Sequence, residues 1–293
     1  MLFASIPSPT TSAVELGPLT IHFYALCILT GITAAYIWGS RRWQQRGGDK
    51  DAFFDIVFAA VIAGVIGARI YHVVTVPGSY FGPGGDPISV LFIWQGGLAI
   101  VGAIMGGALA AWLMCRRKQV SFAVFADSIA PTLFLAQALG RFGNWFNQEL
   151  YGGPTSVPWA LEISCEQNGG IIAGCVAGTY HPTFLYEILW NLAMMVIVLV
   201  ISERLRIGGG RVFWMYAMGY TAGRSWIETM RINDSSIILG QRINTLVAVL
   251  IFIIALVMFI LLTRRAQRVG EAHRADDRPG SDRDLHTLED QVR

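Results

Sequence analysis

The sequence predicts an all-α, polytopic membrane protein with seven transmembrane helices. Three observations support this fold class. Hydrophobic residues make up 54% of the 293 residues and charged residues only 14%, against about 25% charged residues in typical soluble domains. Apolar runs of about 20 residues, the length that crosses a bilayer, recur along the chain. Basic residues concentrate in alternate loops, a pattern that orients a chain across a membrane.

The apolar runs define the predicted helices and the domain organisation. Continuous runs of this length are typical of helices, because a helix satisfies its own backbone hydrogen bonds in lipid. We therefore expect a membrane domain over residues 1–265 with an external loop at about 150–181. The charged tail, residues 266–293, is expected to be cytoplasmic and disordered. In chain order, the predicted helices cover residues 20–38, 53–75, 91–114, 122–139, 183–202, 212–230 and 243–263.

The loops predict how the chain is oriented. Several Lys or Arg residues occur in each of the segments 40–50, 115–121, 203–211 and the stretch after 263. No Lys or Arg occurs in the segments 1–20, 76–90 and 150–181. The positive-inside rule therefore predicts an external N-terminus and a cytoplasmic C-terminus (N-out/C-in). Because residues 1–19 lack a basic n-region, the first helix is expected to be retained.

Unusual polar residues cluster at the predicted outer ends of six helices. An arginine at a helix centre costs ~2.5–3.5 kcal/mol on insertion, so such residues usually pair or bind a ligand. Several guanidinium groups in one membrane protein indicate an anionic ligand such as a phospholipid phosphate. The residues concerned are His22, Tyr24, Arg69, Gly96, Gly97, Arg141, Asn144, Asn147, Glu149, His181, Glu187, Arg224, Glu228 and Arg231.

Structural alternatives exist for several of these residues. Arg224 and Glu228 are spaced i,i+4 and Arg231 follows at i+3, so the three share one helix face. An ion pair would explain two of them and leave at least one arginine unpaired. Arg69 either binds a ligand or snorkels to the headgroups. His22 is either catalytic or an interfacial residue of the aromatic belt.

Other polar residues have expected pairing roles. Asp127 lies early in the fourth helix, near the cytoplasmic side, and is expected to be a hydrogen-bond partner rather than a catalyst. Glu187 lies deeper in the fifth helix and is expected to pair with an arginine. Cys165 and Cys175 both fall in the external loop, where an oxidising compartment permits a disulfide. The alternative is that both thiols stay free.

The densest polar segment covers residues 140–154 and contains four glycines, two asparagines, an arginine and a glutamate. Gly140 and Gly143 allow the backbone to approach a ligand. Arg141 offers a planar fork of donors, and Asn144 and Asn147 offer neutral donors and acceptors. The segment therefore predicts a site for a phosphate and glycerol headgroup.

At these residues the chain resembles the bacterial prolipoprotein diacylglyceryl transferases. That family's signature, G-R-x-G-N-F-x-N-x-E, corresponds to Gly140–Glu149, with Trp145 in place of the usual Phe. The resemblance covers about residues 15–263. Four further family motifs occur in the right order: H-[WF]-Y at His22–Tyr24, G-x-R at Gly67–Arg69, H-P-x-x-L-Y-E at His181–Glu187, and the arginine, glutamate and arginine at Arg224, Glu228 and Arg231.

The resemblance implies a reaction and the residues that perform it. The diacylglyceryl group of phosphatidylglycerol would move to the thiol of the lipobox cysteine of a prolipoprotein, forming a thioether and releasing glycerol phosphate. Arg141, Arg224, Tyr24 and His22 are the candidate catalytic residues, the two arginines neutralising the phosphate. The general base stays open among Tyr24, His22, Glu149, Glu228 and His181. The candidate substrate-binding residues are Arg69, Asn144, Asn147, Glu149, Glu187, Glu228 and Arg231.

One departure from the family pattern limits the mechanism. Many members carry a histidine in a G-G-x-x-x-H-G-G-L stretch of the third helix, where this chain has Val101. A mechanism that uses this histidine as the general base therefore cannot apply here.

The expected partners are phosphatidylglycerol, prolipoprotein signal peptides and the lipid bilayer, and no nucleic acid, metal or cofactor is expected. The expected location is the bacterial cytoplasmic membrane, with the active site towards the outer leaflet. An anionic lipid or organic anion transporter is the alternative, since intramembrane arginines would suit it too. Transporters commonly contain internal repeats and a site near the midplane, and this sequence indicates neither.

Overall fold

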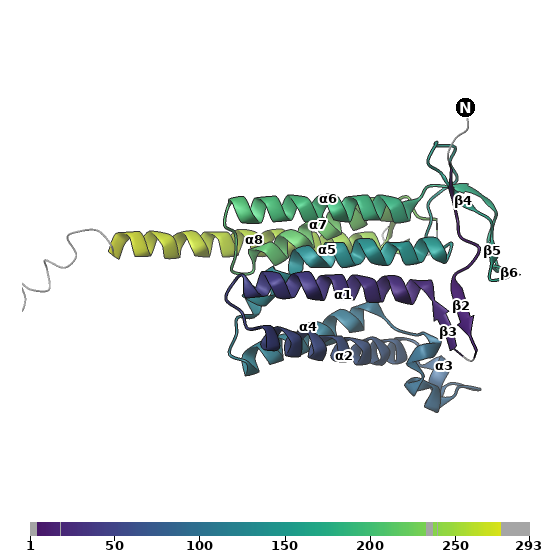
Figure 1. Cartoon of the computed structure of the whole chain (residues 1–293), viewed down its shortest axis with the longest axis horizontal. Coiled ribbons are helices and arrows are strands. Elements are labelled where there is room, and N and C mark those ends of the chain that lie inside the picture. Colours follow the sequence, from purple (N-terminus) through teal and green to yellow (C-terminus); the bar gives the residue numbers. More distant parts are fainter. Residues whose placement is uncertain (1–4, 18, 233–236, 239, 277–293) are drawn as a thin grey trace, which may run out of the picture.

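The computed structural model describes residues 5–17, 19–232, 237–238 and 240–276. Within this part of the chain, seven long helices lie side by side, and short strands gather at one end of the bundle (Figure 1). The long helices are α1 (Phe23–Gln44), α2 (Lys50–Thr75), α4 (Ile100–Arg117), α5 (Phe122–Phe146), α6 (Thr183–Arg204), α7 (Arg211–Glu228) and α8 (Ile243–Asp276).

Among the described residues, six of these helices are long and apolar enough to cross a membrane: α1, α2, α4, α5, α6 and the Ile243–Arg268 part of α8. The chain is therefore mostly helical and has the character of a multi-pass membrane protein. Helix α7 has 18 residues but is less apolar, since it includes Arg211, Arg224 and Glu228. That all seven helices cross the membrane, N-out/C-in, stays a prediction.

The third predicted helix, 91–114, is wrong at its start, because α4 begins only at Ile100. The preceding residues form the short helix α3 (Gly78–Phe81) and the 3₁₀ helices η1 (Pro87–Leu91) and η2 (Ile93–Gln95). Gly96 and Gly97 do not begin the helix but precede it, with left-handed φ values of 91° and 70°. Such a backbone conformation interrupts a helix, although the apolar composition continues through it.

The helices pack in pairs, with the closest contacts at glycines. A Cβ added to Gly102 of α4 would lie 2.1 Å from the carbonyl oxygen of Gly67 in α2. A Cβ added to Gly31 of α1 would lie 2.8 Å from the carbonyl oxygen of Ala136 in α5. The backbones of α2 and α4, and of α1 and α5, are therefore in direct contact, as is common where membrane helices carry small residues at their interface.

Asp127 caps the start of α7 from the neighbouring helix α5. Its buried carboxylate accepts hydrogen bonds from the backbone N–H groups of Gly210, at 2.8 Å, and Phe213, at 3.0 Å. The α7 N-cap residue, Gly210, has no side chain to perform this task, and the first N–H groups of a helix need acceptors. The predicted role of Asp127 as a hydrogen-bond partner is confirmed.

Short strands make the all-α prediction incomplete. Strands β1 (Ile6–Pro7), β4 (Leu161–Ile163) and β7 (Gly178–Tyr180) form one sheet in the order β1-β4-β7, with β1 parallel and β7 antiparallel to β4. Each strand has only two to four residues, too few for a clear sequence signal. The other strands form three hairpins: β2 (Ala13–Leu16) with β3 (Leu19–His22), β5 (Glu166–Gln167) with β6 (Gly170–Ile171), and β8 (Ile237–Ile238) with β9 (Gln241–Arg242).

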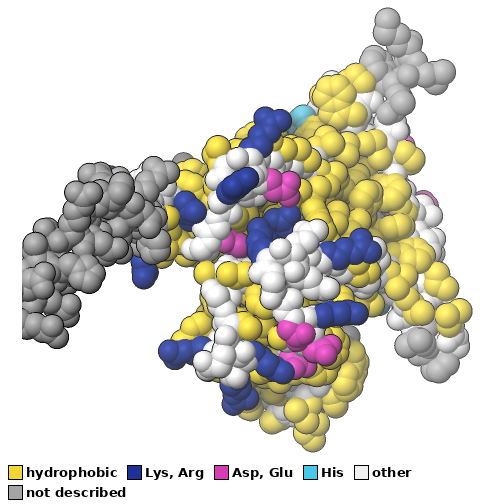
Figure 2. All heavy atoms as spheres, turned by 60° about the vertical axis from the view of Figure 1, so that its left-hand side comes forward, with side chains coloured by type: hydrophobic (Ala, Val, Ile, Leu, Met, Phe, Trp, Pro, Cys, Tyr) yellow, Lys and Arg dark blue, Asp and Glu magenta, His cyan; other side chains and the backbone are white. Residues whose placement is uncertain are grey.

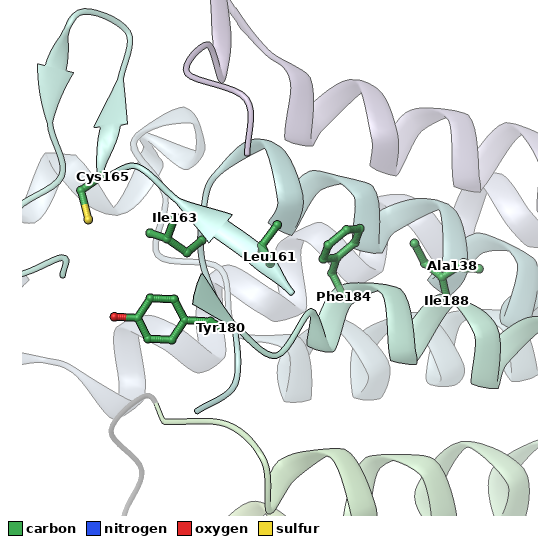
Figure 3. Packing of buried hydrophobic residues seen from close by; sticks show 7 residues of the cluster. All are labelled: Ala138, Leu161, Ile163, Cys165, Tyr180, Phe184 and Ile188. Atoms are coloured by element: carbon green, nitrogen blue, oxygen red, sulfur yellow. The ribbon is translucent and has the colours of Figure 1, made fainter. Parts of the chain in front are cut away.

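The three-stranded sheet is anchored on α5 and α6 by buried side chains. Leu161, Ile163 and Tyr180 of the strands belong to one core cluster with Phe184 and Ile188 of α6, and Ala138 of α5 completes it on the helical side (Figure 3). Cys165, just after β4, belongs to the same cluster. The segment between α5 and α6 is therefore a folded layer fixed to the helices.

The opposite end of the bundle carries the basic loops. Figure 2, which brings this end forward, shows Lys and Arg side chains gathered over it. At the strand end, by contrast, the connecting segments 76–90 and 150–181 contain no Lys or Arg. Helix α8 continues to Asp276, through the first part of the tail predicted to be disordered, and the rest of that tail, residues 277–293, lies outside the described residues.

Candidate functional site

Most of the predicted site residues meet where α5 ends, α6 begins and α7 ends, at the strand end of the bundle; Arg69 and His22 lie apart from them. Backbone hydrogen bonds join these three segments. The N–H of Gly152 donates to His181 O at 2.9 Å, and the N–H of Gly153 donates to Met230 O at 3.1 Å. Gly152 also forms a β-bridge with Arg231. The turn that follows α5 is therefore fixed between the start of α6 and the end of α7.

Glu187 joins two arginines from different helices. Its Oε2 lies 2.5 Å from Nε of Arg141, and its Oε1 contacts Nη2 of Arg231. The side chains of Glu187 and Arg231 are almost fully buried, at 6% and 4% exposure, whereas that of Arg141 is 19% exposed. The prediction that Glu187 pairs with an arginine is confirmed, and of the two guanidinium groups the Arg141 group is the more accessible.

Glu228 forms a second buried centre of charge. Its Oε2 lies 2.9 Å from Nη2 of Arg224, the i,i+4 pair considered from the sequence, and its side chain is 0% exposed. Nη1 of Arg242 lies 3.5 Å from Oε1, and Asn244 donates to the same oxygen at 2.9 Å. Arg242 and Asn244 were missed in the sequence analysis. They could have been found from their position in the sequence, since they lie at the start of the last apolar run, at the end of the bundle where α7 ends.

The Gly140–Glu149 segment extends the Glu187 centre into a continuous chain of polar contacts. Arg141 Nη1 donates to Oδ1 of Asn144 at 3.1 Å, and Nδ2 of Asn144 donates to Oε1 of Glu149 at 2.8 Å. Asn147 donates to the same Glu149 oxygen at 3.2 Å. The chain of contacts thus runs from Glu187 through Arg141 and Asn144 to Glu149.

Four arginines and three glutamates gather in this partly buried group. Arg141 and Arg224 both lie within electrostatic reach of Arg231, and such interactions are strong where water is scarce. The partly exposed guanidinium groups of Arg141 and Arg224 can attract an anion. The group consists of Arg141, Arg224, Arg231, Arg242, Glu149, Glu187 and Glu228, and we call it the arginine cluster.

An open cavity of about 290 Å³ lies beside the arginine cluster, between α1 and α5. One part of its wall is polar and consists of Tyr24, Gln137, Arg141 and Asn144; the remainder is apolar, with Ile28, Ile32, Leu133, Ala136 and Gly140. A Cβ added to Gly140 would meet no atom within 4 Å, so the backbone is open to this space. We call it the arginine cavity.

Gly143 and Gln137 shape the arginine cavity. A Cβ added to Gly143 would lie 2.3 Å from Cδ2 of Tyr24, so the glycine allows the tyrosine ring to lie against α5. Gln137 donates to the Tyr216 hydroxyl at 2.7 Å, while its buried Oε1 has no partner among the described residues. Gln137 was also missed in the sequence analysis. It could have been found from the sequence, because it is a polar residue in an apolar run, one helical turn before Arg141.

Arg69 lies in a different environment. Its guanidinium group donates to the carbonyl oxygens of Val90 and Gly96, both at 2.7 Å, and of Gly97 at 3.2 Å, and also to that of Ser89. The residue is buried, so it does not snorkel to the surface. It fixes the loop that precedes α4. Its predicted role in substrate binding is untested and stays a prediction.

His22 and Val101 are both exposed. His22 ends β3, where it pairs with Ala13 of β2, and its side chain makes no hydrogen bond within the described part of the chain. The catalytic role predicted for it stays a prediction. His181, by contrast, lies within the site region, with Nδ1 3.1 Å from the Tyr186 hydroxyl.

Cys165 and Cys175 form a disulfide, so the structure realises the first of the two alternatives considered for these thiols. The bridge lies in the folded layer between α5 and α6. It closes a short loop that contains the β5–β6 hairpin.

Comparisons with known proteins agree with the motifs. The family model described as prolipoprotein diacylglyceryl transferase matches residues 11–261. A phosphatidylglycerol–prolipoprotein diacylglyceryl transferase of Cutibacterium acnes is 51% identical over 270 residues, which cover 92% of this chain and 90% of that protein. Proteins of the same name from Corynebacterium efficiens and Rhodococcus jostii are 47% and 46% identical, over 97% and 95% of this chain and 91% and 80% of their own lengths. The chain belongs to the prolipoprotein diacylglyceryl transferase family.

Proposed function

We propose that the chain transfers the diacylglyceryl group of phosphatidylglycerol to the cysteine thiol of prolipoproteins, the activity given in the names of its relatives. The observation that carries the proposal is the arginine cluster, with the partly exposed guanidinium groups of Arg141 and Arg224, beside a cavity that is polar on one part of its wall and apolar on the rest. A phospholipid has the same division into an anionic headgroup and apolar chains. The transporter alternative has no observation in its favour, since the polar residues lie at one end of the bundle.

Arg141 is the arginine best placed to contact the lipid phosphate. Its Nε and Nη1 are occupied by Glu187 and Asn144, while Nη2 makes no hydrogen bond with the described residues. The side chain also lines the arginine cavity. A fixed guanidinium group with a remaining donor can form a charge-assisted hydrogen bond to a phosphate oxygen.

Arg224 has a comparable environment. Its side chain is 21% exposed and is held by the buried carboxylate of Glu228. In this proposal Glu187 and Glu228 orient these two partly exposed arginines, and Arg231 completes the buried network. As the carbon–oxygen bond of the lipid breaks, its electron pair moves to the departing glycerol phosphate. The arginines stabilise the charge that develops there, without reorganising.

The acceptor thiol has to lose its proton. A free thiol has a pKa near ~8.5, and a positive site favours the thiolate. Glu149 is our candidate base, because its Oε1 is fixed by Asn144 and Asn147 while Oε2 makes no hydrogen bond with the described residues. The sulfur then attacks the lipid carbon, the thioether forms, and the proton passes to Glu149. Tyr24, which lines the arginine cavity, would contact the lipid headgroup.

We place the site on the outer side of the bacterial cytoplasmic membrane. Two observations support this: the basic loops lie at the other end of the bundle (Figure 2), and the disulfide lies at the site's end, as expected for an oxidising compartment. A reporter fused after residue 265 should be cytoplasmic, and one inserted near residue 165 should be external. The reverse pattern would overturn the orientation.

The activity is tested by incubating the purified protein with phosphatidylglycerol and a signal peptide that contains its cysteine. The peptide should gain the mass of a diacylglyceryl group. Phosphatidylethanolamine with the same acyl chains should react poorly, since its headgroup has no net negative charge, and a peptide with serine in place of cysteine should be inert. Absence of the adduct would refute the proposed function, and equal rates with both lipids would refute the charge argument.

A further inference from the structure

A second cavity, of about 310 Å³, lies outside the long helices. It is open on one side and is lined by Gln148–Tyr151, which follow α5, by Ile172–Cys175 of the disulfide-closed loop, and by Ile232, which follows α7. No residue that lines the arginine cavity lines this one. We call it the loop cavity.

One hydrogen bond connects the two cavities. Asn144 lines the arginine cavity, Glu149 lines the loop cavity, and Nδ2 of Asn144 donates to Oε1 of Glu149 at 2.8 Å. A transfer reaction between two substrates has to bring both of them to the same place, and two cavities that meet at a proposed base provide such a place. The proposed base, Glu149, lies at this junction, so a second substrate in the loop cavity would present its reacting group to Glu149.

The walls of the loop cavity do not match an anionic lipid. Its described lining contains the carboxylate of Glu149 but neither Lys nor Arg, and the rest of the wall combines polar groups with the apolar side chains of Leu150, Ile172 and Ile232. Ile171 and Val176, next to this wall, are strongly exposed, although they lie outside the long helices. The volume is at the lower end of the ~300–1,000 Å³ range of ligand pockets, enough for a few side chains of a polypeptide.

The walls are held in place before any substrate arrives. Gln148 is 3% exposed, and its Oε1 accepts the N–H of Cys165 at 3.1 Å. Its Nε2 donates to Glu166 O at 2.8 Å and to Pro9 O at 3.0 Å. Cys165 is also part of the core cluster that anchors the sheet (Figure 3), and it is bonded to Cys175. A preformed cavity lowers the entropic cost of binding a flexible chain.

We propose that the loop cavity binds the acceptor polypeptide, as an extended segment whose small and apolar side chains flank the cysteine, and that it delivers the thiol to Glu149. This assignment rests on the proposed function, because it gives the second substrate of that reaction its place. The first substrate, the lipid, occupies the arginine cavity on the other side of the Asn144–Glu149 hydrogen bond.

A substitution that fills the loop cavity tests the proposal. Ala173 is exposed and lines the cavity, whereas Ala177, two residues after Cys175, is exposed but does not line it. Ala173→Trp should raise the KM for the peptide by about tenfold, which corresponds to about 1.4 kcal/mol of binding free energy. The KM for phosphatidylglycerol should not change. Ala177→Trp is the matched control and should leave both values near those of the unmodified protein.

Two controls show whether both variants are folded. Their disulfide should be intact by mass spectrometry under non-reducing conditions, and their thermal unfolding should be unchanged. An unchanged peptide KM in folded Ala173→Trp, or an equal rise in both variants, would overturn the proposal while the proposed function stands. An unmodified protein that forms no adduct with any peptide would instead overturn the proposed function.

Protection of the disulfide gives a readout that does not depend on turnover. Cys175 lines the loop cavity, so a bound peptide should shield the bridge. A peptide with serine in place of the acceptor cysteine should slow reduction of Cys165–Cys175 by a hydrophilic reductant, and phosphatidylglycerol alone should not. Equal reduction rates with and without saturating peptide would contradict the assignment.

Discussion

Arg141 and Glu187 touch each other, yet the structure predicts opposite consequences for their removal. Arg141→Ala deletes the more accessible guanidinium group, and Glu187 keeps the buried Arg231 as its partner. Glu187→Gln instead deletes the carboxylate that holds both arginines. The first change should therefore remove activity from a folded protein, whereas the second should weaken the fold itself.

The expected magnitudes follow from burial. The Arg141 side chain is partly exposed, so losing its ion pair should cost about 1 kcal/mol of unfolding free energy. Without the fixed guanidinium group beside the phosphate, turnover should fall by about 10²–10³-fold. Arg231 is almost completely buried, and a buried charge that loses its partner costs about 3–5 kcal/mol. Glu187→Gln should show that larger loss.

The assay combines thermal unfolding in detergent with the rate at which the diacylglyceryl-peptide adduct forms. Arg141→Lys serves as the charge-matched variant and should recover little activity, because an ammonium group cannot reproduce the planar fork that contacts Glu187 and Asn144 at once. Near-normal turnover by Arg141→Ala would refute the phosphate contact. If Arg141→Ala unfolds as readily as Glu187→Gln, the role of Arg141 is structural.

Three further substitutions probe other parts of the account. Glu228→Gln should lower unfolding free energy by about 1–3 kcal/mol and also slow transfer, because Arg224 loses its charged partner; normal values for both would contradict the second charge centre. Gln148→Leu should speed backbone hydrogen exchange around Cys165, since several buried groups lose their partner; unchanged exchange would argue against this anchor. Asp127→Ala should cost about 0.5–2 kcal/mol of unfolding free energy with near-normal transfer by the folded fraction, and a selective loss of transfer would contradict its purely structural role.

The sequence allowed the gathering of the polar residues to be predicted, but not their pairing. The alternation of apolar runs and basic loops places the ends of α5 and α7 and the start of α6 on one side, so Arg141, Glu187 and Glu228 had to lie near one another. Which carboxylate meets which arginine depends on helix rotation and crossing angle. The ion pair between Glu228 and Arg242 is an example. The two residues are 14 positions apart in the sequence, and the packing of α7 against α8 brings them together.

Other differences between the prediction and the structure have local causes. The apolar run before α4 contains Gly96 and Gly97 in left-handed conformations, and hydropathy alone does not detect such a break. Arg69 was expected to snorkel or to bind substrate; it does not snorkel, because it donates to loop carbonyls whose position depends on that same break, and its role in substrate binding stays a prediction. The strands were missed because each has at most four residues and pairs with a segment remote in sequence or across a short turn.

The central claim, that the lipid headgroup lies against Arg141 and Asn144, is tested most directly by photolabelling. An analogue of phosphatidylglycerol with a diazirine on its headgroup glycerol keeps the phosphate charge and reacts with whatever lies beside it. After irradiation and proteolysis, we expect the label on the part of α5 that includes Gly140 and on Tyr24 of α1, with competition by unlabelled phosphatidylglycerol. Label confined to the region of Arg69, with none on α5, would contradict the account.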